Sequence, residues 1–107
     1  MNQYNLKEYF PDLAIELECL LRQEEEYQLA EQIDELQIVD RCRCKEYFCG
    51  MFYTAPKPDG AWGPKHRNVT LDPESGEITL DVVDEKITAV EILFRSDFRE
   101  RLFQLLP

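Results

Sequence analysis

Apolar residues in the first third of the chain recur at helical spacing. Four leucines at i, i+4, i+7 and i+8 predict one apolar stripe on a helix, namely Leu13, Leu17, Leu20 and Leu21. Pro11 fits the first turn of this helix, where its missing N–H is no loss; the alternative is that Asp12 is the cap. A second stripe follows three consecutive glutamates and consists of Tyr27, Ala30, Ile33 and Leu36. We predict two helices over residues 12–36 with a tight turn between them; one bent helix is the alternative.

From residue 37 onward the spacing becomes that of strands. Alternation through Cys42 and Cys44 predicts a short extended segment, and the apolar run 47–54 predicts a strand that is covered on both faces. Residues 55–66 hold three prolines and two glycines, so we expect an irregular loop there. Loops of this length in a compact domain are often functional.

The last third predicts three antiparallel strands at 68–71, 77–83 and 86–94, joined by short turns. Ser96 is expected to cap a final helix over 96–106. The apolar stripe of that helix consists of Phe98, Leu102, Leu105 and Leu106. Because the strands form one run between helices, the predicted fold class is α+β, with an antiparallel meander sheet of about four strands over residues 38–94. A chain of 107 residues is long enough for a single domain, residues 1–107.

Charge is distributed unevenly along the chain, which narrows the class of partner. The formal net charge is −10. Residues 1–40 carry 2 basic and 11 acidic side chains, residues 41–68 carry 6 and 2, and residues 69–107 carry 4 and 9. Such a chain repels nucleic-acid phosphates at long range and attracts basic proteins, so we expect a basic protein partner and no nucleic acid. The alternative is an acidic surface that only keeps the domain soluble.

The polarity of the first residues and the length of the apolar runs indicate the cellular compartment. Residues 1–8 are polar and mixed, and no apolar run has the length needed to span a bilayer. We therefore expect a cytoplasmic protein with no membrane partner. In that compartment the cysteines are expected to be reduced thiols, metal ligands or reactive groups rather than disulfides.

Three of the four cysteines and the only histidine lie between residues 42 and 66. On a strand, Cys42 and Cys44 would point their sulfurs to the same face. Together with Cys49 and His66 they form a ligand set that suits tetrahedral zinc, although C-x-C is a less specific spacing than C-x₂-C. The alternative is that these cysteines are small apolar side chains near the core, the role expected for Cys19 on the first helix.

A cysteine-dependent enzyme is a further alternative. Basic side chains that alternate with the cysteines would lower a thiol pKa, and His66 could act as a base. The sequence shows no companion acid and no group that would stabilise an oxyanion. The expectation is therefore that the protein is not an enzyme.

Two segments are candidate surfaces for a partner. The predicted helices carry an acidic set, Glu24, Glu25, Glu26, Glu31 and Asp34. The loop region carries Trp62 and Arg67, and these two residue types are enriched at protein interfaces. The alternatives are an ordinary solvated helical face and a Trp62 that folds back over the sheet.

The centre of the chain resembles a family of small uncharacterised bacterial proteins. The resemblance is carried by Asp40-Arg41-Cys42-Arg43-Cys44, Phe48-Cys49, Phe52-Tyr53-Thr54-Ala55-Pro56, Gly60-Ala61-Trp62-Gly63-Pro64 and His66-Arg67-Asn68, and continues through Leu80-Asp81-Val82-Val83-Asp84, Ile87 and Val90-Glu91-Ile92-Leu93. It covers roughly residues 12–107 and implies no activity. In size and acidity the chain is also similar to immunity proteins that neutralise basic nuclease toxins, a likeness of composition without a motif.

These patterns together predict a non-enzymatic protein-binding domain without a cofactor. The specific hypothesis is an acidic immunity-type inhibitor of a basic, nuclease-like bacterial toxin. A small zinc-binding domain is the alternative, and a cysteine-dependent enzyme is the third possibility.

Overall fold

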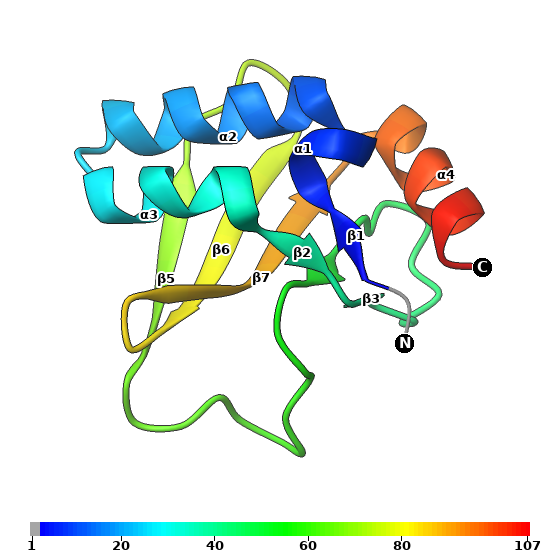
Figure 1. Cartoon of the computed structure of the whole chain (residues 1–107). Coiled ribbons are helices and arrows are strands. Elements are labelled where there is room, and N and C mark those ends of the chain that lie inside the picture. Colours follow the sequence, from blue (N-terminus) through cyan, green and yellow to red (C-terminus); the bar gives the residue numbers. More distant parts are fainter. Residues whose placement is uncertain (1–2) are drawn as a thin grey trace.

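The computed structural model describes residues 3–107 and shows a five-stranded antiparallel sheet with helices packed on one of its faces (Figure 1). The five strands lie in the order β3-β4-β7-β6-β5. Their bounds are Asp40–Arg41 (β3), Phe52–Tyr53 (β4), His66–Leu71 (β5), Glu77–Val83 (β6) and Lys86–Leu93 (β7). The predicted α+β class is confirmed, and this sheet has five strands where about four were expected.

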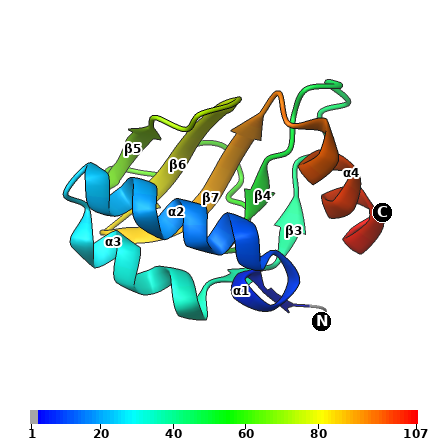
Figure 2. The ribbon, with the colours of Figure 1, turned by 90° about the horizontal axis from the view of Figure 1, so that it is seen from above.

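Helices α2 (Pro11–Gln23) and α3 (Tyr27–Gln32) lie across one face of the sheet, and α4 (Ser96–Leu105) lies beside its β3–β4 edge (Figure 2). Pro11 is the first residue of α2, as predicted. The chain reverses between α2 and α3 through Glu25, whose φ is 60°. The prediction of two helices with a tight turn is therefore confirmed, and α3 continues into a 3-10 turn, η1 (Ile33–Glu35).

A small second sheet forms at the start of the chain and was not predicted. Strand β1 (Tyr4–Asn5) pairs with β2 (Gln37–Ile38), and helix α1 (Leu6–Tyr9) follows β1 directly. The Asn5 side chain caps α1 by accepting a hydrogen bond from the Glu8 N–H at 2.9 Å. Elements of two and four residues are too short to show a period in the sequence.

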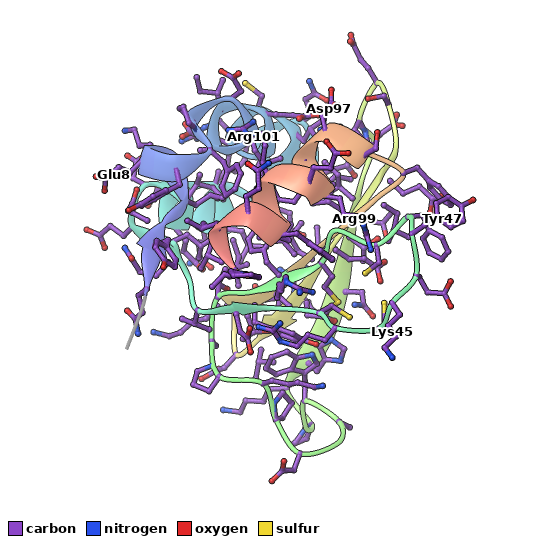
Figure 3. All side chains as sticks on the ribbon, turned by 90° about the vertical axis from the view of Figure 1, so that its right-hand side faces the viewer. Glu8, Lys45, Tyr47, Asp97, Arg99 and Arg101 are labelled. Carbon is purple, nitrogen blue, oxygen red and sulfur yellow. The ribbon has the colours of Figure 1, made fainter. Side chains whose placement is uncertain are left out.

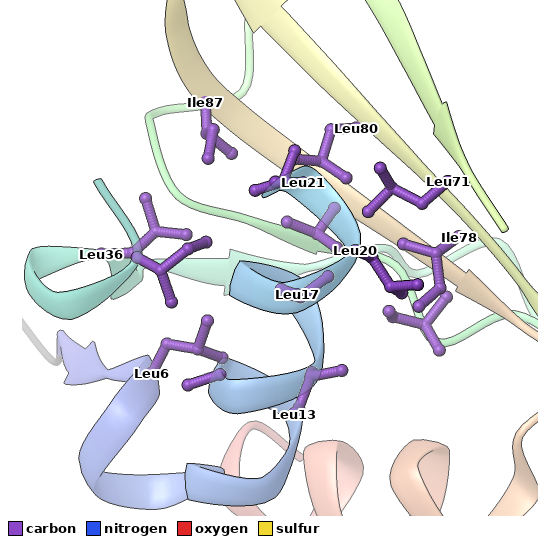
Figure 4. Close-up of a cluster of buried hydrophobic side chains, with 14 of the residues drawn as sticks. Leu6, Leu13, Leu17, Leu20, Leu21, Leu36, Leu71, Ile78, Leu80 and Ile87 are labelled. Carbon is purple, nitrogen blue, oxygen red and sulfur yellow. The ribbon is translucent and has the colours of Figure 1, made fainter. Parts of the chain in front are cut away.

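The core lies between the helices and the sheet. The leucine stripe of α2 meets the inward residues of β6, where Ile78, Leu80 and Val82 alternate with outward polar residues (Figure 4). Each buried side chain of this size stabilises the fold by about 1.5–3 kcal/mol relative to an exposed one. A second apolar group joins α4 to the sheet, because the Phe98 ring lies 5.8 Å from that of Phe52.

Four local predictions were wrong. Ser96 does not cap α4: it is the first helical residue, and no side chain caps this helix. Residues 47–54 form only the two-residue strand β4 and one isolated bridge between Cys49 and Leu93. Cys19 is exposed on α2 rather than packed in the core, and Tyr27 is exposed on α3.

In the described part of the chain, none of the helices is long and apolar enough to cross a membrane.

Candidate metal centre and the outer face of the sheet

Three cysteines come together at the β3–β4 edge of the sheet. The Sγ atoms of Cys42, Cys44 and Cys49 all lie within 4.8 Å of one another. The Cys44 side chain is exposed, that of Cys42 is half-buried and that of Cys49 is buried. Figure 3 shows sulfur atoms (yellow) close to Lys45, on the segment that follows β3. The cluster is thus accessible from solvent on one side and closed on the other.

Local backbone hydrogen bonds hold the segment between β3 and β4 in a compact loop. The Cys42 N–H donates to the Met51 carbonyl at 2.9 Å, and the Cys49 N–H donates to the Glu46 carbonyl at 3.1 Å. Lys45 adopts a left-handed conformation, with φ of 71°, which turns the chain back after Cys44. This turn, rather than the strand alternation expected from C-x-C, brings Cys42 and Cys44 beside Cys49.

The Gly50 position fits closely between β7 and α4. Its N–H donates to the Ile92 carbonyl at 2.7 Å. A Cβ at this position would lie 3.1 Å from that oxygen and 3.2 Å from the Phe98 ring. Glycine therefore allows the segment that carries Cys49 to lie against the sheet edge.

The three thiols differ in acidity because their surroundings differ. The main-chain N–H of Glu46 lowers the pKa of the Cys44 thiol, and hydrogen bonds from Cys42 and Cys49 lower it further. Burial raises the pKa of the Cys49 thiol to about 12. These surroundings favour the thiolate at the exposed Cys44 and disfavour it at the buried Cys49.

The predicted four-ligand zinc set is not assembled, because His66 lies elsewhere. His66 is on β5, at the opposite edge of the sheet from β3, and its Nε2 lies 2.7 Å from Oδ1 of Asp81. The Asn68 amide donates to the same Asp81 oxygen at 2.8 Å. Among residues 3–107, the one group of three or more metal-ligating side chains is the cysteine cluster. The same separation removes His66 as a base for a cysteine nucleophile.

A row of residues that is polar except for Ala89 crosses the outer face of the sheet, the face away from α2 and α3. The strand register aligns Asp40, Tyr53, Ala89, Asp81 and Asn68, one residue from each strand. Burial raises the pKa of Tyr53, and the nearby Cys42 and Asp81 raise it further. The Tyr53 ring thus lies between the cysteine cluster and the His66–Asp81 pair.

Asp81, Asn68 and Tyr53 were not among the predicted site residues. Asp81 could have been found from the sequence, because it occupies an outward position of β6 between buried Leu80 and Val82. Trp62 lies on this face as well, with its ring 6.4 Å from that of Tyr53. The half-buried Trp62 therefore folds back over the sheet, as the alternative interpretation of the loop predicted.

Two of the predicted partner-binding residues are bound to each other. Arg67 donates from Nη1 and Nη2 to both carboxylate oxygens of Glu26 at 2.9 Å, and it also donates to Glu85. Hydrogen bonds from Arg67 lower the pKa of Glu26. Arg67 therefore ties the α2–α3 turn to the turn between β6 and β7, so neither it nor Glu26 is available to a partner without losing this bond.

The other predicted acidic residues remain at the surface. Glu24, Glu25 and Glu31 are exposed, and none of their side chains has a hydrogen-bond or ion-pair partner within residues 3–107. Asp34 is exposed and pairs with Lys7 at 3.2 Å. The structure therefore leaves three of the predicted acidic positions open to a partner.

No protein-family model, no curated protein and no solved structure matches this chain. The resemblance to a family of small bacterial proteins accordingly stays a prediction. What the chain can do is argued below from its own residues.

Proposed function

We propose that the protein is a small, non-enzymatic domain that binds a soft divalent metal ion, zinc above all, through Cys42, Cys44 and Cys49. The observation that carries this proposal is the approach of three Sγ atoms to within 4.8 Å of one another. Thiolates are the ligands that zinc prefers in protein sites, with Zn–S bonds of about 2.3 Å. Sulfurs around a tetrahedral zinc stand roughly 3.8 Å apart, so metal binding needs only a small contraction of the cluster.

The segment that carries two of the ligands can make this adjustment. Residues 42–46 belong to no strand or helix, and the exposed Cys44 lies within this segment. Cys49 is fixed by its bridge to Leu93 on β7 and gives the site its anchored ligand. Three protein ligands leave one position of a tetrahedral metal for water or for a donor atom of a partner.

Basic side chains next to the cluster would offset the negative charge of the three thiolates once a metal binds them. Arg41 and Arg43 flank Cys42, and the Arg99 Nε donates to the Cys49 carbonyl at 3.1 Å. Three thiolates and one Zn²⁺ carry a net charge of −1, which neighbouring cations stabilise. Binding releases thiol protons, so zinc affinity should rise with pH.

Metal content tests this proposal. Protein purified without a chelator or histidine tag is expected to carry about one zinc per chain, because the cluster offers one site. Cys44→Ser should remove the zinc, whereas the matched control Cys19→Ser should retain it, since Cys19 is exposed on α2 and outside the cluster. His66→Ala should also retain it, which separates the three-thiol site from the four-ligand set.

Cobalt(II) gives an independent readout of the same site. Thiolate ligation should produce a charge-transfer band in the near ultraviolet for the wild type and for Cys19→Ser, but not for Cys44→Ser. Wild-type protein that holds no zinc and shows no such band would refute the proposal.

A second candidate function is protein binding through the acidic surface, in the manner of an immunity-type inhibitor of a basic toxin. The observation that favours it is the exposure of Glu24, Glu25 and Glu31 without an ion-pair partner in the described residues. Opposite fields accelerate association with a cationic partner.

Charge reversal tests this second candidate. Glu25→Lys with Glu31→Lys should slow association with a basic nuclease domain and weaken its salt dependence. The control pair Glu74→Lys with Glu100→Lys makes the same charge change at other exposed positions. Equal association rates for the two double variants would place the interface elsewhere.

A further inference from the structure

We propose that a cationic groove between β3 and α4 binds a phosphate-bearing ligand, a function beyond the proposed metal site. The groove has a volume of about 410 Å³. Four cationic side chains and one aromatic ring line it, namely Arg41, Arg43, Lys45, Arg99 and Phe103. A cluster of this sign is unexpected on a chain with a net charge of −10.

Two of the guanidinium groups are held in place by the Phe103 ring. The Cζ atoms of Arg41 and Arg99 lie 3.7 and 4.2 Å from the ring centroid, within the range of cation–π contacts. Main-chain oxygens fix the same side chains further, because Arg41 donates to Leu106 and Cys42, and Arg99 donates to Cys49. A ligand that binds here meets donors that are already ordered, which reduces the entropy lost on binding.

Several donors of the groove have no partner within residues 3–107. Arg41 uses Nε and Nη1, which leaves Nη2, and Arg99 uses Nε alone, which leaves both Nη atoms. Lys45 donates no hydrogen bond in this part of the chain, and it lies on the same side of the molecule as Arg99 (Figure 3). Arg43, in contrast, is occupied by the Pro107 oxygen and by Asp40.

The charge and the number of donors favour phosphate over a single carboxylate. Asp40 pairs with Arg43, so three cations, Arg41, Lys45 and Arg99, remain without a hydrogen-bonded carboxylate within residues 3–107, which suits a dianion. A carboxylate fills the fork of one guanidinium, whereas a phosphate group presents three oxygens that can reach two guanidiniums and an ammonium. Acidic residues farther away than about 8 Å are largely screened at physiological ionic strength.

Calorimetric titration with inorganic phosphate, phosphoserine and adenosine monophosphate tests the proposal at low salt and neutral pH. Wild-type protein should show saturable one-to-one binding of phosphate, with an affinity that falls as salt is added. Tighter binding of one of the two esters would identify the molecule that presents the phosphate, and equal binding would identify phosphate itself. A wild type that shows no saturable phosphate binding would overturn the proposal.

Three substitutions locate the site. Arg99→Gln should weaken phosphate binding by about tenfold or more, because it removes hydrogen bonds between charged groups. Lys45→Gln should weaken it in the same direction and leaves folding intact, since Lys45 makes no hydrogen bond in the described chain. Arg101→Gln is the matched control on the same helix: Arg101 packs on the Phe10 ring, away from the groove.

The metal-site proposal and the groove proposal can be tested independently of each other. Cys44→Ser, which removes a proposed zinc ligand, should leave phosphate affinity within about twofold of the wild type. If Arg99→Gln and Lys45→Gln both bind phosphate as tightly as the wild type, the groove is not the site. Zinc content of Lys45→Gln, measured alongside, should equal that of the wild type, because Lys45 is neither a proposed zinc ligand nor bound to one.

Discussion

Arg67 joins two turns that lie far apart in the sequence, and a double-mutant cycle measures how much this link stabilises the fold. Its two hydrogen bonds to Glu26 are 2.9 Å long, and the side chains are 38% (Arg67) and 26% (Glu26) exposed. A hydrogen bond between charged groups contributes about 1.5–3 kcal/mol when shielded, whereas an exposed ion pair contributes about 0.2–1 kcal/mol. This pair lies between these limits, so we expect a coupling free energy of about 1 kcal/mol.

The cycle consists of wild type, Arg67→Met, Glu26→Gln and the double variant, each unfolded in urea at pH 7. Arg67→Met also breaks the contact with Glu85. This loss cancels in the cycle, because Arg67→Met is compared in the wild-type background and in the Glu26→Gln background. The control cycle uses Lys7→Met and Asp34→Asn, a single 3.2 Å contact between side chains that are 60% and 62% exposed. Its coupling should be below about 0.3 kcal/mol.

The same cycle has a defined pH dependence. Because Arg67 lowers the pKa of Glu26 in the folded state, the stabilisation is fully present above the unfolded pKa near 4.5 and is lost as pH falls through the lower folded pKa. The coupling should therefore be smaller at pH 3 than at pH 7. Equal coupling in the Arg67 and Lys7 cycles, or coupling that grows on acidification, would refute the structural role of this pair and restore Glu26 and Arg67 as candidates for a partner surface.

Two further predictions concern the cysteine cluster and a turn. Among the three cluster cysteines of metal-free protein at neutral pH, iodoacetamide should modify Cys44 first and Cys49 last. The reason is that Cys44 is exposed and has a lowered pKa, whereas burial raises the pKa of Cys49 to about 12. Peptide mass mapping over time measures the order, and modification of Cys49 as fast as Cys44 would contradict it. Gly76→Ala should destabilise the fold by at least about 1 kcal/mol in urea unfolding, because φ at this position is +70° and a Cβ would lie 2.5 Å from the Leu93 oxygen. Gly60→Ala, at φ +96° with nothing within 4 Å, isolates the backbone contribution, so an equal loss in both variants would show that the Leu93 contact is unimportant.

The sequence alone determined the regular elements that have a period. The leucine stripe of α2 and the alternation along β6 each span several repeats, and both elements form where they were predicted, with their apolar residues in the core. The short turn between residues 71 and 77, which contains Gly76, and the tight turn at the three glutamates, Glu24–Glu26, were also predicted, because they interrupt these periods. Short β1 and α1 lack a period, and β1 is held by a strand distant in the chain, so the local pattern could not reveal them. Of the strand predicted over residues 47–54, only β4 and the Cys49–Leu93 bridge form, because the partner strand decides how far pairing extends.

The tertiary structure alone decided which chemical groups meet. Cys42, Cys44 and Cys49 form a cluster because the left-handed turn at Lys45 and the bridge to Leu93 fold their segment back on itself. The order of strands places β3 and β5 at opposite edges of the sheet, which separates His66 from the thiols although both occur in the central third of the sequence.

The cationic groove is a second site that only the tertiary structure assembles. Arg99 joins Arg41 and Lys45 only because α4 packs against the edge of the sheet that β3 forms, more than fifty residues earlier in the chain. Residue type and spacing predict the local structure that each segment forms with its neighbours in sequence. Strand order and helix docking depend on the summed burial of many side chains, and these decide which distant groups share a site.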